Sequence, residues 1–466
     1  MGTVPVEQIA GIVGAQNVAS SLEERCCYSY DASKLRAVPE CVAFPGSTAE
    51  VAELLNLANR DVFPVFPRGA GSGMVGASVP WSGGLVIAMN RLNRILEIDS
   101  ENMIAVVQPA VITASLQKKV AQLGLFYPPD PASLQFSTLG GNVAMCSGGP
   151  RAVKYGVTRD YVMGLEVVLP NGAVIHTGSR SLKSVVGYDL TRLMVGSEGT
   201  LGIFTQIMLR LLPQPESLRT LLAVFPILED AAQAVANIIK NRIIPCTLEL
   251  MDQITIQVVE NYLHVGLPIG AEAVLLIELD GQECVLEQEL SRVVAICHDA
   301  GATAIEIAHS EMERERLWQA RRSISPALGQ IRPGKINEDI AVPRTRVPAL
   351  IKAIRALAEK YQLLIACFGH AGDGNIHTNI MLDPNDPHER KRAEQAVEEL
   401  LRVVLELGGT LSGEHGIGIA KSPFFQWEVG REGWEVMWRI KQALDPHNIL
   451  NPGKMFVGNR AFFRDR

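Results

Sequence analysis

The sequence lacks an excess of basic residues, since 43 Lys and Arg stand against 50 Asp and Glu for a net charge of −7. This balance argues against nucleic acid as a partner, because nucleic-acid binding depends on neutralising phosphates. Long hydrophobic runs are also missing, and no apolar stretch reaches the roughly 18 residues of a membrane span. The N-terminus shows no basic region followed by an apolar stretch. We therefore expect a cytoplasmic chain without a membrane span.

Cysteine is scarce, and its spacing predicts no metal cluster. None of the eight cysteines forms a CxxC pair. They are Cys26, Cys27, Cys41, Cys146, Cys246, Cys284, Cys297 and Cys367. Because most lie among apolar residues, we expect reduced, buried thiols. Any iron–sulfur cluster that serves this chain must then belong to a partner.

Glycine is what the sequence does have, and the first glycine patch lies at residues 67–76. Four glycines occur within residues 69–76. Such a backbone can adopt positive φ and bring several N–H groups close to an anionic pyrophosphate. The alternative is an ordinary flexible surface loop.

A G-x-G-x-x-G spacing lies within residues 71–76, with Glu97 and Asp99 further on. This dinucleotide fingerprint also requires a helix that begins at the last glycine. Pro80 and the apolar run 85–89 leave no room for one. The sequence therefore predicts a glycine loop between two strands and not a Rossmann turn.

Two more glycine patches follow, at residues 138–149 and 195–202. Between them, an Asn171-Gly172 turn predicts a hairpin of strands 162–169 and 173–177. We expect each patch to lie at the end of a strand. Three patches are more than one phosphate needs, so they suggest a long ligand laid across one domain.

The chain of 466 residues suggests roughly two to four domains. In the first part, we expect α+β structure with strands that pair locally, a capping box at residues 47–50, and loop and turn over residues 20–34. Expected strands are 41–45, 63–66, 85–89, 95–99, 103–107 and 203–212; expected helices are 5–13, 51–59 and 112–123.

Pro213-Gln214-Pro215 marks a boundary, and the pattern then alternates between strands and helices. This alternation predicts a sheet with helices on one face. Expected strands are 219–225, 246–251, 273–279, 302–308, 362–368 and 375–381; expected helices are 228–240, 253–263, 282–300, 317–325, 345–361 and 386–407. The turn-rich residues 444–456 could return to the first domain.

Two motifs bring histidine together with glycine. Residues 368–379 place His370 and His377 across a tight glycine turn, and Glu414 and His415 stand between glycines further on. Two histidines and a glutamate suffice for a divalent metal with open positions. His415 is better suited to act as a general base, because adjacent side chains diverge. The alternative is that these histidines cap turns and Glu414 is a solvated acid.

Five other histidines do not stand out by position and are interpreted as structural or solvated. They are His176, His264, His298, His309 and His388. Upstream of the two motifs, Arg321, Arg322 and Lys335 form a basic group that suits a carboxylate. By itself this group is equally typical of a solvated basic face.

Taken together, these motifs resemble the FAD-linked 2-hydroxyacid dehydrogenases of the vanillyl-alcohol-oxidase type over nearly the whole chain. This family includes D-lactate dehydrogenase, the flavoprotein subunit of glycolate oxidase and D-2-hydroxyglutarate dehydrogenase. The motifs are residues 67–76, 137–142, 154–156, 197–202, 369–377, 412–418 and 451–454.

The resemblance implies a two-part FAD-binding domain over residues 1–216 and an α+β cap domain over residues 217–444, with an antiparallel sheet covered by helices. It implies that residues 445–466 return to the FAD domain. The implied FAD-binding residues are Arg68, Gly69, Ala70, Gly71, Ser72, Gly73, Thr138, Gly140, Gly141, Asn142, Gly148, Glu198, Gly202, Ile203 and Asn451. Some relatives attach FAD covalently to a histidine where this chain has Ser72, so we expect non-covalent FAD.

For the reaction, the resemblance implies a metal, zinc or manganese, held by His370, His377 and Glu414. It implies that Arg321, Ser325, Lys335 and Asn379 bind substrate and that His415 is the base. The expected reaction is oxidation of a D-2-hydroxyacid, with D-lactate or glycolate favoured, in which a hydride passes to flavin N5.

The resemblance implies an electron acceptor other than NAD, namely an iron–sulfur subunit, an electron-transfer flavoprotein or a quinone. Such a partner could hold the chain at the inner face of a membrane, and a homodimer is also compatible. Alternatives are a D-2-hydroxyglutarate dehydrogenase, a redox-neutral transferase resembling alkylglycerone-phosphate synthase, and a non-catalytic flavin subunit. The third alternative should lack the paired histidines and the Glu-His loop, which this chain has.

Overall fold

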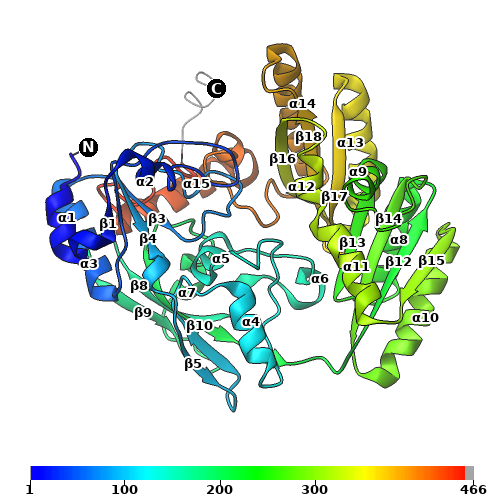
Figure 1. Ribbon diagram of the computed structural model, residues 1–466, viewed down its shortest axis with the longest axis horizontal. Helices are drawn as coiled ribbons and strands as arrows, with labels where there is room; N and C mark the ends of the chain where they lie inside the picture. Colours follow the sequence, from blue (N-terminus) through cyan, green and yellow to red (C-terminus); the bar gives the residue numbers. More distant parts are fainter. Residues whose placement is uncertain (1, 457–466) are drawn as a thin grey trace. The chain divides into compact units, whose positions relative to one another are not determined.

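The computed structural model describes residues 2–456, which form two compact units (Figure 1). The first unit contains residues 2–147, 157–214 and 414–456, and the second contains residues 148–156 and 215–413. Over this described part of the chain, no helix combines the length and the hydropathy that a membrane crossing requires.

The first unit begins with a small sheet in the strand order β1-β2-β4-β3. Its strands are β1 (Val18–Ala19), β2 (Cys41–Ala43), β3 (Val65–Arg68) and β4 (Leu85–Ala88). Because β2 and β3 both run parallel to β4, the expectation of local pairing is wrong here. Parallel strands need a crossover connection, and α3 (Thr48–Asp61) carries the chain from β2 to β3.

Helix α3 begins where its capping residues predict. The Ser47 side chain accepts a hydrogen bond from the Glu50 N–H at 3.2 Å. The Glu50 carboxylate accepts from the N–H of Gly46, one residue before the position that a capping box requires. The apolar face of α3 packs with α1 (Val6–Val13) and the small sheet in one buried core.

The second sheet of this unit is antiparallel, in the order β5-β6-β10-β8-β9. Its strands are β5 (Ile95–Asp99), β6 (Ile104–Val107), β8 (Val162–Val168), β9 (Val174–Gly178) and β10 (Ile203–Arg210). The hairpin predicted from Asn171-Gly172 is confirmed as the β8–β9 pair. The remaining α-helices and β-strands of this unit are α2 (Leu22–Cys26), α4 (Thr113–Ala121), β7 (Leu125–Phe126), α5 (Leu139–Met145), α7 (Leu190–Met194), β11 (Leu212–Pro213) and α15 (Phe425–Leu444).

Three local expectations for this unit are wrong. Residues 20–34 contain the short helix α2, which Ser21 caps. The second glycine patch does not follow a strand but forms the first turn of α5, with Thr138 as its N-cap. The third patch follows the helix α7. The sequence did not reveal this helix because the glycines at 140 and 141 have low helix propensity. The helix forms nevertheless, because the N-cap and packing outweigh that propensity.

The second unit contains one antiparallel sheet in the order β15-β12-β14-β13-β17-β18-β16. Its strands are β12 (Ser217–Phe225), β13 (Thr247–Asp252), β14 (Ala273–Gly281), β15 (Ala304–Ala308), β16 (Gly334–Ala341), β17 (Leu364–His370) and β18 (Asn375–Leu382). Its helices are α6 (Ala152–Tyr155), α8 (Leu228–Lys240), α9 (Gln253–Leu263), α10 (Glu283–Asp299), α11 (Glu311–Arg322), α12 (Ile324–Leu328), α13 (Val347–Tyr361) and α14 (Pro387–Glu406).

Helices cover both faces of this sheet, so the expectation of helices on one face is wrong. Helices α9, α11 and α12 pack with Met251 and Leu276 in one buried core. Helices α8, α10 and α13 cover the opposite face (Figure 1). Strand residues on both faces are apolar and buried, for example all of residues 273–277. A continuous apolar run of this kind is typical of a strand covered on two sides.

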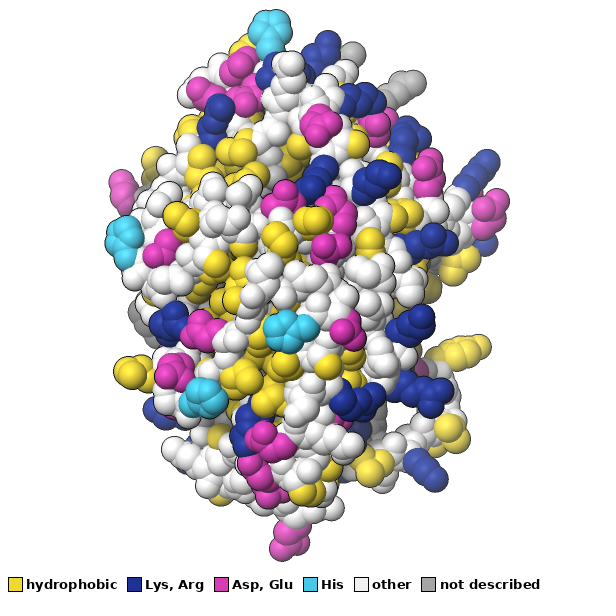
Figure 2. Space-filling view, turned by 90° about the vertical axis from the view of Figure 1, so that its right-hand side faces the viewer, with side chains coloured by type: hydrophobic (Ala, Val, Ile, Leu, Met, Phe, Trp, Pro, Cys, Tyr) yellow, Lys and Arg dark blue, Asp and Glu magenta, His cyan; other side chains and the backbone are white. Residues whose placement is uncertain are grey.

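The surface agrees with the charge balance, whereas the cysteines agree only in part. In Figure 2, acidic and basic side chains are intermixed and neither sign dominates the face shown. All eight cysteines are free thiols. Four are buried, but Cys26, Cys27 and Cys284 are exposed, so the prediction of mostly buried thiols is wrong for these three.

Candidate active site

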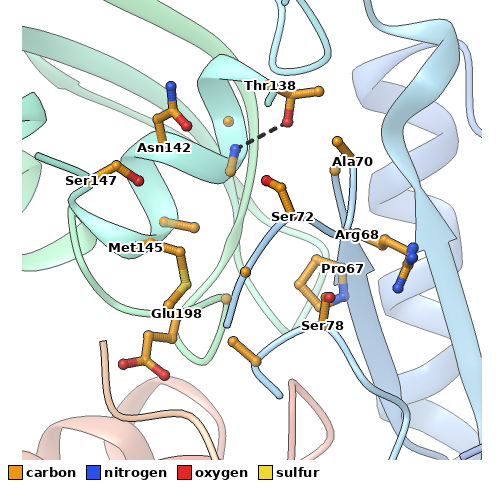
Figure 3. A pocket seen from close by; sticks show the side chains of 18 of the residues that line it. Pro67, Arg68, Ala70, Ser72, Ser78, Thr138, Asn142, Met145, Ser147 and Glu198 are labelled. Atoms are coloured by element: carbon orange, nitrogen blue, oxygen red, sulfur yellow. Dashed lines mark hydrogen bonds between the residues drawn. The ribbon is translucent and has the colours of Figure 1, made fainter. Parts of the chain in front are cut away.

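A pocket in the first unit brings the three glycine patches together. It contains about 1270 Å³ of space, including its open mouth, whereas pockets for small ligands usually contain about 300–1,000 Å³. In Figure 3, Ala70 and Ser72 of the loop after β3 form one wall. Asn142 and Met145 of α5 form the facing wall. The pocket therefore has the size and backbone lining for an elongated ligand.

Most of the residues predicted to bind FAD line this pocket. They are Arg68, Gly69, Ala70, Gly71, Ser72, Gly73, Thr138, Gly140, Gly141, Asn142, Glu198, Gly202, Ile203 and Asn451. Gly148 is the exception, because it belongs to the second unit. Pro109, Ala132 and Ser133 also line the pocket. No sequence motif indicated these three, since an apolar or small wall residue carries no chemical signature.

The glycine loop and α5 meet at Gly69. A Cβ atom at this position would lie 2.3 Å from Oγ1 of Thr138. That same oxygen caps α5 by accepting a hydrogen bond from the Gly141 N–H at 3.4 Å (Figure 3). Only glycine at position 69 lets the two pocket walls approach this closely.

The Arg68 side chain supports the loop. Its Nη1 donates to the carbonyl oxygen of Tyr30 at 2.7 Å, and its guanidinium lies 5.6 Å from the ring centre of Tyr28. A Cβ atom at Gly71 would collide with this guanidinium. The buried guanidinium thus helps to fix the shape of the loop, whose backbone faces the pocket.

Glu198 holds the Glu-His loop. Its carboxylate oxygens accept hydrogen bonds from the N–H groups of Ile417 and Gly418, each at 2.7 Å. Burial raises the pKa of Glu198 to about 6, although these two hydrogen bonds oppose the increase. Glu414 and His415, half-buried in the same loop, line the pocket. The structure thus places the predicted base at the wall of the predicted FAD pocket.

Asn451 provides a test of whether FAD fits the pocket. Its Nδ2 donates to the carbonyl oxygens of Ala77 at 2.9 Å and Glu198 at 2.6 Å. Its Oδ1 is buried and has no hydrogen-bond partner within residues 2–456. Because buried acceptors are nearly always satisfied, this atom fits an N–H donor of a bound ligand. A flavin ring offers such a donor, so the pocket fits FAD.

In the second unit, strand register gathers the other candidates on one face of the sheet. His377 on β18 pairs with Asp339 on β16 and with Phe368 on β17. Directly paired residues, and residues two apart along a strand, point to the same face. His370 and Lys335 therefore lie on this face too. The prediction that both imidazoles converge is consistent with a distance of 5.1 Å between the ring centres of His370 and His377.

A buried ion pair lies beside His370. Nδ1 of His370 lies 2.7 Å from Oε1 of Glu249. The other carboxylate oxygen of Glu249, Oε2, accepts a hydrogen bond from Nε of Arg321 at 2.6 Å and forms an ion pair with Nη2 of Arg321 at 2.5 Å. Burial raises the pKa of Glu249, but the charge of Arg321 and the hydrogen bonds from His370 and Arg321 outweigh burial and lower it to about 2. Glu249 is fully buried, which makes this ion pair part of the interior.

A second carboxylate lies beside His377. Oδ1 of Asp339 is 3.6 Å from Nδ1 of His377, and it accepts from Nδ2 of Asn375 at 2.7 Å. Ser412 donates to Oδ2 of Asp339 at 3.0 Å, and the Gly413 N–H donates to the Asp339 carbonyl at 3.2 Å. The residue just before Glu414 is thereby fastened to the strand that carries Asp339.

The remaining substrate-binding candidates differ in burial and in their contacts. Lys335 donates to Oγ of Ser325 at 3.1 Å, so this pair is assembled. Asn379 is fully buried, and its Oδ1 accepts from Nδ2 of Asn337 at 2.7 Å. Arg322 is exposed and pairs with Glu315. Neighbouring residues on a helix point in different directions, so Arg321 and Arg322 do not both belong to one basic group.

Sequence reasoning missed Glu249 and Asp339. Glu249 shares the buried strand β13 with Asp252, and Asp339 directly follows Glu338 in β16. Acids within strands usually occupy exposed or paired positions without a catalytic role. Only the pairing of β13 with β17 and of β16 with β18 places them against the histidines. For Glu249, the signal available in the sequence was an acid inside a mostly apolar strand.

Two family models match the chain: a FAD binding domain over residues 39–178 and the C-terminal domain of FAD linked oxidases over residues 214–455. The chain is 47% identical over 452 residues to glycolate oxidase subunit GlcD of Bacillus subtilis (strain 168), with 97% of this chain and 96% of that protein covered. It is 35% identical over 432 residues to D-lactate dehydrogenase of Anaerostipes hadrus, with 90% of each covered.

Two solved structures share the fold. A p-cresol methylhydroxylase with bound substrate has a TM-score of 0.81 at 17% identity, with 98% of this chain and 97% of that chain covered. An alkyldihydroxyacetonephosphate synthase has a TM-score of 0.76 at 22% identity, with 97% and 86% covered. At these identities the likeness concerns the fold alone.

The family models and the relatives define an FAD-linked oxidoreductase, and its α+β fold is of the vanillyl-alcohol-oxidase type. Within that class, the chain belongs to the FAD-linked oxidase family. The expectations of this fold, of FAD and of enzymatic oxidation are confirmed.

Proposed function

We propose that this protein oxidises a small D-2-hydroxyacid, glycolate or D-lactate, to the 2-oxoacid with the help of a divalent metal. The assembled His370–Glu249–Arg321 cluster carries this proposal, because it places a candidate metal ligand beside a candidate carboxylate anchor. The names of the relatives, glycolate oxidase subunit and D-lactate dehydrogenase, support this class of substrate.

FAD would lie along the glycine loop and α5, held without a covalent bond because Ser72 offers no imidazole. When bound, FAD supplies the hydride acceptor, N5 of the flavin ring. The protein contributes orientation. The backbone of residues 69–73 would position the pyrophosphate, and Oδ1 of Asn451 would accept a hydrogen bond from the ring.

The metal ligands would be His370, His377 and Glu414. Two imidazoles and a carboxylate suit zinc or manganese, and the two rings are already close together. Glu414 follows Gly413, which is bonded to the Asp339 backbone, so chain connectivity keeps it near the second unit. When bound, the cation supplies a Lewis acid that favours loss of the substrate hydroxyl proton.

The substrate carboxylate would bind Arg321 and the Lys335–Ser325 pair, with Asn379 completing the site. Two cations around one carboxylate fix its position and orientation. His415 would accept the hydroxyl proton as the C2 hydride leaves, since a neutral imidazole accepts a proton near pH 7. Its place in the pocket wall supports this role.

The reduced flavin must pass its electrons on. The chain itself has no cysteine spacing for an iron–sulfur cluster, so we assign the acceptor to a partner: an iron–sulfur subunit, an electron-transfer flavoprotein or a quinone. The word "subunit" in the name of the Bacillus subtilis relative supports a protein partner. Purification of the native complex tests this assignment, and it also tests for a homodimer and for attachment to a membrane through the partner.

The decisive experiment is anaerobic mixing of the yellow protein with a panel of D- and L-2-hydroxyacids, including glycolate, both lactates and 2-hydroxyglutarate. We expect glycolate or D-lactate to bleach the flavin absorbance and L-lactate to leave it unchanged. Metal content should be measured on the same sample. If no hydroxyacid bleaches the flavin, the proposal is wrong. Full turnover of a lipid substrate without metal would instead identify a redox-neutral transferase.

A further inference from the structure

Glu249 connects two groups with different predicted roles. One carboxylate oxygen contacts Nδ1 of His370, and the other holds Arg321. The glutamate is fully buried, so these two contacts are made in the interior of the second unit. A single carboxylate therefore touches a predicted metal ligand with one oxygen and a predicted substrate anchor with the other.

The contact with His370 determines which ring nitrogen carries the proton. A carboxylate only accepts hydrogen bonds, so the neutral imidazole must donate from Nδ1. The lone pair then lies on Nε2, on the other side of the ring. A histidine bound to metal through Nε2 commonly donates its second N–H to a carboxylate in this way.

The contact with Arg321 determines where its guanidinium points. Its Nε and Nη2 face Glu249, and its Cζ lies 4.9 Å from the ring centre of Phe368. The planar group is therefore held on one edge and on one face. A guanidinium has five N–H donors. Because the group is planar and held in this way, the donors on the edge away from Glu249 have a fixed direction.

We propose that Glu249 is a positioning residue that sets the metal-binding tautomer of His370 and aims Arg321, so that one buried carboxylate aligns the metal ligand with the carboxylate anchor. This inference rests on the proposed function for the identity of the two ligands. It extends that function by assigning the alignment to β13, a strand on which no motif lies.

The substitution Glu249→Gln separates the two tasks. An amide has one donor end and one acceptor end, and Arg321 offers only donors. The amide oxygen of E249Q must therefore face Arg321, and its NH₂ must face His370. His370 then accepts at Nδ1 and carries its proton on Nε2, the atom that would bind the metal. The orientation of Arg321 is kept, whereas the tautomer of His370 is reversed.

The experiment titrates Zn²⁺ and Mn²⁺ into metal-stripped, FAD-loaded wild type, E249Q and the control E278Q. Glu278 is a suitable control because it is buried in the same sheet and bonds Thr220 and Trp318. We expect metal affinity to fall about 10–100-fold in E249Q and to stay within about twofold in E278Q. In the double variant H370A/E249Q, the second change should have no further effect on metal affinity.

Ring-nitrogen NMR of holoprotein labelled with ¹⁵N-histidine tests the tautomer directly, with the His370 signals assigned from H370A. We expect the proton on Nδ1 in the metal-free wild type and on Nε2 in E249Q. An unchanged metal affinity in folded, FAD-loaded E249Q, or a wild-type proton on Nε2, would overturn the inference. A tautomer switch in a protein that binds neither metal would support the role of Glu249 at His370 and contradict the proposed metal.

Discussion

At the scale of single residues, the pocket wall is built by side chains that fasten backbone to backbone. Glu198 holds Ile417 and Gly418, and Asn451 ties Ala77 to Glu198. These contacts leave His415 at the pocket wall. Supporting residues thus bond to the backbone, whereas a residue with a chemical role lines the pocket. Substitutions should distinguish the two kinds of residue by their effects.

His415→Ala should remove the proton acceptor and leave the pocket otherwise intact. We expect the rate of anaerobic flavin reduction by the hydroxyacid to fall about 10²–10⁴-fold, with FAD content unchanged. Stopped-flow absorbance measures the rate. His176→Ala is the control, because His176 is exposed and contacts Glu166 away from the pocket. Loss of FAD from H415A would show that the histidine is structural.

Glu198 should make stability depend on pH. Burial raises its pKa from 4.5 to about 6, so the folded state favours the protonated carboxyl more than the unfolded state does. The stabilisation from this group is complete below pH 4.5 and is lost as the pH rises through about 6, in total roughly 2 kcal/mol. Urea unfolding of wild type and E198Q on both sides of this window should show a difference that changes with pH. A constant difference would contradict the assignment.

At the scale of elements, the pocket depends on how closely the loop after β3 approaches α5. The two elements meet at one point, where the backbone of Gly69 lies against the capping oxygen of Thr138. In the second unit, the equivalent determinant is the register of β16, β17 and β18, which places Asp339, His377 and Phe368 side by side.

Gly69→Ala should separate the two pocket walls. Its Cβ would lie 2.3 Å from Thr138 Oγ1, whereas a Cβ at Gly73 would meet only Asp31, at 3.9 Å. We expect G69A to destabilise the FAD-free protein by about 1–3 kcal/mol and to weaken FAD binding, and G73A to change the stability of FAD-free protein by less than about 0.5 kcal/mol. Denaturant unfolding without FAD measures both. Equal effects would show that the contact with Thr138 is unimportant.

At the scale of the whole molecule, the two units carry different chemistry. The FAD pocket is lined by residues of the first unit, and His370 and His377 belong to the second. The chain crosses between units at Gly413–Glu414, between the residue bonded to Asp339 and the residue that lines the pocket.

Removal of metal should therefore separate substrate oxidation from FAD binding. We expect a chelator to abolish flavin reduction by hydroxyacid while FAD stays bound with its visible spectrum unchanged. Adding Zn²⁺ or Mn²⁺ should restore reduction. The measurement is anaerobic flavin bleaching before and after chelation, with free FAD determined by filtration. Full reduction in metal-free protein would exclude the proposed metal.

The sequence by itself determined the class of protein, because glycine patches and His-Glu motifs are local and each can be recognised within about ten residues. It also predicted most strands and helices, since hydrophobic periodicity is a local property. It did not reveal that the glycines at 140 and 141 begin a helix, because the cap at Thr138 and packing outweigh propensity.

Only the tertiary structure decided which acids stand behind the histidines. Glu249 precedes His370 by 121 residues, and the two meet only because β13 pairs with β17. A shift of one residue in that register would turn every side chain of the strand to the other face. The identity of the supporting carboxylates is therefore a property of the folded sheet, set by pairing between distant segments that no local pattern specifies.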